Sequence, residues 1–326
     1  MTGLLLLLTL TNITTDTSHK DFHWGANGHP ITQEAYWNNQ ELQMSLLKKA
    51  GLTYYRLDLA TNSDGTILPA TADRFYHIIK IAADSGITLI PIVFLESSGT
   101  LYKLSADTAY EHGKTAGSGF ARAYKQYFTY YELGNENDGE VLNQPAGDGD
   151  DIAHYDTAKL AILAAYLRGM SEGVRQEDSK AKIIVNNSGW KHYMYFDLLD
   201  KQGVKFDIIG YHWYQDLHSL RGVLRVLRSW FPDKRVWFTE FNSQGTLHEQ
   251  TGSQVQQVRK EINAISRIGR NVDALFFYEL LDEPAAPATS TEAHYGLYNW
   301  DRRYDSVLAK PILGVIRKAQ SDWIQH

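Results

Sequence analysis

Two glutamates stand at the ends of apolar runs in this chain: Glu136 closes the stretch "YYELGNE" and Glu240 closes "VWFTE". Two carboxyl groups that share one site push one pKa upward, because like charges oppose each other's ionisation. A charged carboxylate beside a protonated carboxyl is what a retaining glycosidase uses, the first to attack the anomeric carbon and the second to protonate the leaving oxygen. This chemistry requires carboxyl groups about 5–5.5 Å apart. The fold must therefore bring Glu136 and Glu240 together.

Polar side chains also close the neighbouring apolar runs. A single Asn or Glu in such a place is usually a helix cap or a loop hydrogen bond, but so many together exceed what packing requires. Alternate residues of a strand share a face, so Arg56 and Asp58 are predicted to point the same way, as are His212 and Tyr214. The pairs are Arg56 and Asp58 in "YYRLDL", Asn186 and Asn187 in "IIVNN", His212 and Tyr214 in "GYHWY", and Tyr278 and Glu279 in "FFYELL".

The apolar runs alternate with amphipathic helical patterns, and we count eight such units along the chain. Apolar stripes at helical spacing extend from Leu160 to Val174 and from Val255 to Ile268, and glycine stands at the predicted helix ends Gly51, Gly86 and Gly269. The predicted strands are His23–His29, Tyr54–Leu59, Thr88–Phe94, Tyr130–Glu136, Lys182–Asn187, Phe206–Tyr214, Arg235–Asn242 and Asp273–Leu280.

Strands that are apolar on both faces and joined by crossover helices indicate a parallel sheet covered by helices. Eight such units favour a closed (β/α)8 TIM barrel over an open doubly wound sheet, and no G-x-G-x-x-G follows the first strand to support a dinucleotide site. The stretch "PAGDGDD" (145–151) is interpreted as a loop over the barrel mouth. We therefore expect one catalytic domain over residues 21–326, preceded by an extension over residues 1–20.

In such a barrel the active site lies at the carboxyl ends of the strands. The fourth and seventh strands lie across the barrel from each other, so Glu136 and Glu240 are predicted to point into one mouth. In the seventh strand Val236, Phe238 and Glu240 share parity, which predicts that two apolar layers of barrel core precede the carboxylate.

Composition excludes several other functions. A formal charge of −6 argues against nucleic acid, because nothing would neutralise a run of phosphates. The absence of cysteine excludes disulfides, thiolate nucleophiles and Cys-ligated zinc. Twenty tyrosines and eight tryptophans suit a flat apolar ligand face with a wet rim. The N-terminal "LLLLLTL" (4–10) is interpreted as a trimmed secretion signal or a short strand, since it is too short to span a bilayer.

The motifs "LGNEND" after the fourth strand and "FTEFN" at the seventh resemble the paired signatures of clan A glycoside hydrolases. "RLDL", "GYHWY", "FFYELLDEP" and "GLYNWD" also resemble that clan, and most of all its family 39 and the cellulase-like family 5. The resemblance covers nearly the whole chain. It implies a retaining β-glycosidase that degrades a poly- or oligosaccharide. We expect endo action, and exo action stays open.

The resemblance implies a role for each matching residue. Glu136 would be the general acid/base and Glu240 the nucleophile. Asn135 would hydrogen-bond the sugar 2-hydroxyl, Tyr214 would hold the Glu240 carboxylate, and Arg56 would keep it ionised. A carboxylate beside a guanidinium stays charged, whereas a carboxyl beside apolar rings, as expected for Glu136, can stay neutral.

The remaining site residues are less sharply defined. His212 would line the sugar site. Many clan members place Trp under the sugar at strand eight, but this sequence has Tyr278 and Glu279 there, so the platform would be Tyr278 or the later Trp300. The sugar and its linkage therefore stay open.

Two rival functions remain open. A metal-dependent barrel hydrolase or isomerase would also use His, Asp and Glu at strand ends, although His23 and His29 do not form H-x-H and no H-E-x-x-H is present. A sugar-binding barrel without turnover is the other. For the glycosidase we expect no cofactor and no metal, a β-linked glycan as the partner, no nucleic acid and no membrane span. Its substrate class favours a secreted or periplasmic location over a cytoplasmic one, and the sequence does not indicate an oligomeric state.

Overall fold

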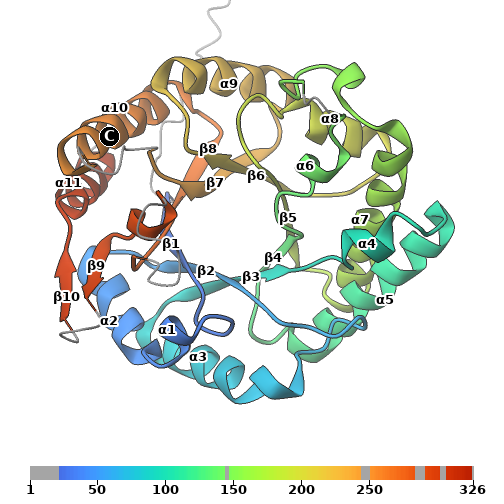
Figure 1. The fold of residues 1–326 in the computed structure, drawn as a ribbon, viewed down its shortest axis with the longest axis horizontal. Coiled ribbons are helices and arrows are strands. Elements are labelled where there is room, and N and C mark those ends of the chain that lie inside the picture. The colour runs from blue at the N-terminus through green and yellow to red at the C-terminus, as the bar shows by residue number, and fades with distance from the viewer. Residues whose placement is uncertain (1–21, 144–146, 244–249, 283–290, 302–305, 325–326) are drawn as a thin grey trace, which may run out of the picture.

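Eight short apolar runs form parallel strands that close into a barrel in the order β1 to β8 (Figure 1). A computed structural model describes residues 22–143, 147–243, 250–282, 291–301 and 306–324. The predicted (β/α)8 barrel is therefore confirmed. The strands are β1 His23–Gly28, β2 Tyr54–Asp58, β3 Thr88–Val93, β4 Tyr130–Leu133, β5 Lys182–Asn187, β6 Ile208–Trp213, β7 Arg235–Phe241 and β8 Val272–Phe277.

Helices surround the strands on the outside of the barrel (Figure 1). Two of them end as their sequences predict, because Gly51 and Gly86 adopt left-handed backbone conformations with φ of 70° and 69°. The helices are α1 Glu34–Trp37, α2 Gln40–Ala50, α3 Ala72–Ser85, α4 Ser98–Leu101, α5 Ala106–Tyr124, α6 Asp138–Val141, α7 Thr157–Glu177, α8 Met194–Lys201, α9 Leu217–Trp230, α10 Gln250–Ile268 and α11 Ile312–Ile324, and the late strands β9 Tyr298–Asp301 and β10 Ser306–Ala309 pair as an antiparallel hairpin.

The core has two layers that the strands separate. The larger layer fills the space between the strands and the helices, and it takes up the predicted stripes of α7 and α10. The smaller layer consists of inward-pointing side chains of the strands, as is typical of such barrels. Its buried members are Ile90, Ile184, Ile208, Trp237, Ala274 and Phe276.

The alternation predicted for the seventh strand is wrong. Trp237 lies inside the barrel, whereas Val236 and Phe238 belong to the outer layer. Between β6 and β7 the pairing steps from Gly210↔Trp237 to His212↔Glu240, which places one extra residue in β7. This β-bulge reverses the alternation, so Glu240 faces the mouth although it has the parity of two outward-facing residues.

Two further predictions concern the ends of the chain. Residues 1–20 lie outside the described part, so the extension and the alternative readings of "LLLLLTL" stay predictions. Among the helices that the structure describes, none combines the length and apolar character needed to cross a membrane.

Candidate active site

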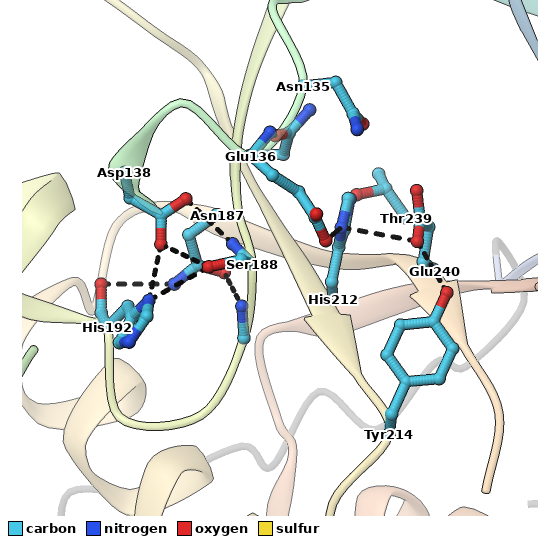
Figure 2. Close-up of polar contacts among 12 residues, drawn as sticks. Asn135, Glu136, Asp138, Asn187, Ser188, His192, His212, Tyr214, Thr239 and Glu240 are labelled. Atoms are coloured by element: carbon cyan, nitrogen blue, oxygen red, sulfur yellow. Dashed lines mark hydrogen bonds and ion pairs between the residues drawn. The ribbon is translucent and has the colours of Figure 1, made fainter. Parts of the chain in front are cut away.

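Glu136 and Glu240 meet in the mouth of the barrel, with His212 between them (Figure 2). His212 Nδ1 lies 2.7 Å from Glu136 Oε1 and 3.5 Å from Glu240 Oε2. A carboxylate oxygen of each glutamate falls within 4.8 Å of the other. This spacing matches the roughly 5–5.5 Å of a retaining pair and is shorter than the roughly 6.5–9.5 Å that leaves room for the water of an inverting enzyme.

Glu240 is the more enclosed of the two acids, and two donors hold its carboxylate. Its side chain is 9% exposed, against 39% for Glu136. Arg56 Nη1 donates to Oε1 at 2.7 Å, and the Tyr214 hydroxyl donates to Oε2 at 2.5 Å. Burial and the Glu240 charge raise the pKa of Tyr214 well above its usual value, so the phenol keeps its proton and remains a donor. Both contacts predicted for Glu240 are present.

Arg56 connects Glu240 to the rest of the barrel floor. Its guanidinium is almost completely buried and also donates to Glu132 Oε2 at 2.5 Å, to Asn27 Oδ1 at 2.8 Å and to Asn135 Oδ1 at 2.7 Å. Two carboxylates therefore share one cation. Burial opposes the charge, but Glu132 and Glu240 more than offset it and raise the pKa of Arg56, so the guanidinium stays charged.

The pKa values of Glu136 and His212 move in opposite directions. Burial raises the pKa of Glu136, but its hydrogen bond with His212 and the charge of that ring bring it below the usual value. Burial lowers the pKa of His212, but Glu240 and Glu136 raise it overall. The expectation that apolar rings keep Glu136 protonated is therefore wrong for the free protein. The two shifts favour the proton on His212, which is fully buried rather than lining an open sugar site, over Glu136.

A second polar cluster supports the loop that carries Glu136 (Figure 2). Asp138 is fully buried, and its carboxylate accepts hydrogen bonds from the Ser188 backbone N–H at 2.9 Å, from the Ser188 hydroxyl at 2.8 Å and from His192 Nδ1 at 2.5 Å. Asn187 donates to the His192 carbonyl at 3.1 Å in the same loop. The cluster ties the segment after β4 to the segment after β5.

The residues predicted at strand eight lie on the opposite side of the mouth. The Tyr278 ring packs edge-on against Tyr214, with centroids 6.1 Å apart, and against His29, at 6.2 Å. Glu279 is fully buried and accepts a hydrogen bond from the Tyr36 hydroxyl, so Tyr278 is the better placed of the two to meet a ligand. Trp300 belongs to β9, but its side chain lies outside the described residues.

Asp58 and His29 form a pair on that same side. His29 Nδ1 lies 3.0 Å from Asp58 Oδ1, and His29 Nε2 lies 3.6 Å from Glu279 Oε2. Burial raises the pKa of Asp58, but its contacts with His29 and Thr32 lower it overall. The shared face predicted for Arg56 and Asp58 thus brings both to the mouth.

One group in the described part of the chain has ligand atoms close enough to hold a metal ion: Glu136, His212 and Glu240. The same atoms are already engaged with one another. The buried Arg56 cation bonded to Glu240 would also repel a second cation there. The donor set therefore suits proton transfer better than metal binding.

Two residues that hold Arg56 escaped the sequence analysis. Glu132 and Asn27 lie inside the barrel, almost completely buried, and both contact Arg56. Glu132 has the parity of Glu136 in "YYELGNE", and a charged residue at an inward position of a strand is the signal that could have identified it. For Asn27 no comparable signal exists, because a short polar residue near a strand end is common.

The sequence model of glycosyl hydrolase family 53 matches residues 102–309, more than half of the chain. No curated protein matches this chain. Similar solved structures include the family 1 β-glucosidase from Thermotoga maritima (TM-score 0.70, 11% identity, covering 93% of this chain and 98% of that chain). The AHE enzyme from Alicyclobacillus herbarius has a TM-score of 0.71 and 12% identity, with 94% and 98% covered. Fpglu1 from Fervidobacterium pennivoraus has a TM-score of 0.71 and 11% identity, with 93% and 96% covered.

At such low identity the structural likeness shows the fold alone, and the family match carries the assignment. The motifs resemble families 39 and 5 at the level of the clan, whereas the matching family is family 53. The chain belongs to glycosyl hydrolase family 53, and it is an endo-acting, retaining glycoside hydrolase of clan A that cleaves β-linked glycans.

Proposed function

We propose that the enzyme cleaves β-1,4-linked galactan by double displacement, with Glu240 as the nucleophile and Glu136 as the general acid/base. The family match supports galactan as the substrate. The observation that carries the mechanism is that oxygens of Glu136 and Glu240 lie within 4.8 Å of each other in the barrel mouth. This separation suits a covalent glycosyl-enzyme intermediate.

In the first step a Glu240 oxygen attacks the anomeric carbon while the bond to the leaving oxygen breaks. Arg56 and Tyr214 support Glu240 as a charged nucleophile, because each donates to one of its oxygens. The proton passes from His212 Nδ1 to Glu136, 2.7 Å away, and from Glu136 to the leaving oxygen. The Glu136–His212 pair thus acts as the acid, and the proton is counted for the pair.

In the second step water attacks the anomeric carbon and the ester bond to Glu240 breaks. The Glu136–His212 pair takes the proton of the water and returns to its starting state. Two inversions at the same carbon give net retention.

The other mouth residues receive binding roles. The Asn135 amide oxygen accepts a hydrogen bond from Arg56. The NH2 group of Asn135 therefore points away from Arg56 and is proposed to donate to the sugar 2-hydroxyl. Tyr278 is the proposed apolar platform for the sugar ring, because it stands at the mouth between Tyr214 and His29.

A polysaccharide panel with product analysis tests the substrate. We expect β-1,4-galactan to yield short oligosaccharides from the earliest times, and xylan, mannan and cellulose to remain intact. Binding of galactan without any cleavage would instead indicate a sugar-binding barrel. NMR of the first products should show the β-anomer, and an α-anomer would overturn the retaining mechanism.

A substitution tests the acid/base assignment. Glu136→Ala should mainly slow substrates with poor leaving groups, because good leaving groups depart without a proton. Azide, which can occupy the vacated space, should partly restore the second step and give a β-glycosyl azide. Equal losses on all leaving groups would contradict the role of Glu136.

A further inference from the structure

The backbone that carries Glu136 has an uncommon conformation. β4 ends at Leu133, and both Gly134 and Glu136 then take left-handed conformations with φ of 74° and 52°. Glycine adopts this conformation freely, but a residue with a long side chain does so at a cost of about 1–3 kcal/mol and needs support. The support comes from the neighbouring strand, because the Glu136 backbone N–H donates to Asn186 Oδ1 at 2.8 Å.

Asn186 can provide that oxygen only in one orientation of its amide. Its Nδ2 donates to Glu132 Oε1 at 2.7 Å and to the Gly134 carbonyl at 2.9 Å. A reversed amide would set oxygen against both of these acceptors and NH2 against the Glu136 N–H. Asn186 is buried, so water would not compensate for these mismatches.

Glu132 fixes this orientation and reaches the nucleophile as well. Its Oε1 accepts from Asn186, while its Oε2 accepts from Arg56 Nε at 2.5 Å. Arg56 in turn donates to Glu240. Glu132 is fully buried, and burying a carboxylate is expensive, so packing alone does not account for it.

We propose that Glu132 and Asn186 are positioning residues that set Glu136 against the glycosidic oxygen and keep it in register with the Arg56–Glu240 pair. Neither residue takes part in bond making. One carboxylate thereby links the two reacting groups, through Asn186 on one side and through Arg56 on the other. This inference rests on the proposed role of Glu136 as the acid/base.

Leaving-group dependence tests the Asn186 side. Asn186→Ala should lower kcat/KM about 10- to 100-fold on an aryl β-glycoside with a poor leaving group, which is part of what a well-placed acid contributes. On a dinitrophenyl glycoside the loss should stay below about threefold, since that group leaves without a proton. Ser171→Ala removes a buried hydroxyl on α7 that donates to the Lys205 carbonyl before the start of β6, away from the mouth, and should affect both substrates equally.

Glu136→Ala, measured alongside, separates the two levels of the account. If Glu136→Ala distinguishes the leaving groups and Asn186→Ala does not, the positioning role is overturned and the acid/base assignment stands. If Glu136→Ala does not distinguish them, the acid/base assignment itself fails. Should Asn186→Ala not fold, Asn186→Ser, which is too short to span the same contacts, provides the same comparison.

The pH profile tests the Glu132 side. The charged groups that face the Glu136–His212 pair are Glu240 from β7, Asp138 from α6 and Arg56 from β2. Glu132→Gln leaves Arg56 less compensated, and a stronger positive field favours loss of the proton from the Glu136–His212 pair. The alkaline limb of kcat/KM should therefore move to lower pH.

Glu177→Gln is the matched control, because Glu177 at the end of α7 is also paired with an arginine, Arg122 at 2.7 Å, and lies outside the mouth. It should leave the limb in place. A limb that stays unchanged in folded Glu132→Gln would overturn the link between Glu132 and the acid/base.

Discussion

The Glu240 carboxylate receives one donor on each oxygen, a guanidinium from β2 and a phenol from the segment after β6. The two donors differ in consequence. Arg56 is fixed by further bonds to Glu132, Asn27 and Asn135. The Tyr214 hydroxyl, in contrast, donates to Glu240 alone among the described residues, and its ring packs against other rings. Tyr214 can therefore be altered without disturbing the barrel floor, which makes it the cleaner probe of Glu240 as the proposed nucleophile.

Tyr214→Phe should lower kcat/KM about 10- to 100-fold, because a hydrogen bond to a charged group contributes roughly 1.5–3 kcal/mol. The unfolding midpoint should change little. Steady-state kinetics on one aryl glycoside provide the measurement. Tyr127→Phe, at an exposed tyrosine, serves as the control. An unchanged rate in Tyr214→Phe would remove the assigned role of the phenol.

The Glu136–His212 pair predicts where activity ends at high pH. In the proposed mechanism activity requires the proton on the pair. Burial lowers the pKa of His212, but Glu240 and Glu136 raise it above its ordinary 6.5 overall. As pH rises through this raised pKa the proton is lost and the rate falls. The alkaline midpoint of kcat/KM should lie above 6.5. A midpoint at or below that value would show that the pair does not hold the proton.

At the scale of elements, helices α5 and α7 pack closely beside β4, which leads to Glu136, and β5, which carries Asn186. α5 leads into β4 and α7 leads into β5. Their backbones nearly touch: a Cβ on Gly169 of α7 would lie 2.0 Å from the Tyr110 carbonyl oxygen of α5, and a Cβ on Gly113 of α5 would lie 2.0 Å from the Tyr166 carbonyl oxygen of α7. Only glycine permits this approach.

Gly169→Ala should therefore lower the free energy of unfolding by at least about 2 kcal/mol, because the helices must separate to admit a methyl group. Gly222→Ala is the matched control, since it lies in α9 with no atom within 4 Å of the added carbon. Gly222→Ala should raise the free energy of unfolding by roughly 0.5–1 kcal/mol. Urea denaturation measures both, and equal effects of the two substitutions would refute the packing argument.

The elements also show how far the sequence could predict the site. All eight strands were predictable because apolar runs, helical stripes and terminal glycines agree with one another. The contacts of Tyr214 and Arg56 with Glu240 were implied by the resemblance to clan A, and both are present. Parity failed in β7, because the bulge next to Glu240 depends on how β6 and β7 pair and has no local signature in "VWFTEFN". The prediction that Glu240 faces the mouth is correct, but the regular alternation of side chains on which it was based is absent from β7.

The proton state of Glu136 was equally out of reach. The pKa of that group depends on His212, which is distant in sequence and is brought within 2.7 Å by barrel closure. The inward parity of Glu132 marks it as unusual, but its role could not be predicted because its partners, Arg56 and Asn186, come from two other strands. Contacts between strands decide these properties, and a single sequence does not encode them in a readable pattern.

At the scale of the whole molecule, one buried carboxyl makes stability depend on pH. Burial in α10 raises the pKa of Glu261 to about 8. The folded-state pKa thus exceeds the ordinary 4.5, so the stabilisation is complete below pH 4.5 and is lost as pH rises through about 8.

Glu261→Gln removes this titration and leaves the shape of the side chain nearly unchanged. Between pH 5 and pH 9 the free energy of unfolding of the variant should rise by on the order of 3 kcal/mol relative to that of the wild-type protein. One pKa unit corresponds to about 1.4 kcal/mol, reduced here by some screening. Urea denaturation at several pH values measures the difference. A difference that is independent of pH would mean that Glu261 is not held protonated in the fold.

The central claim for the molecule is that Glu240 attacks the sugar. A 2-deoxy-2-fluoro aryl glycoside of the preferred sugar slows both steps, and a good leaving group lets the first step outrun the second, so the intermediate accumulates. Peptide mapping by mass spectrometry then locates the sugar. The account predicts a single glycosyl ester on Glu240 that is absent in Glu240→Gln. A sugar attached to any other residue, or inactivation with no ester on Glu240, would contradict it.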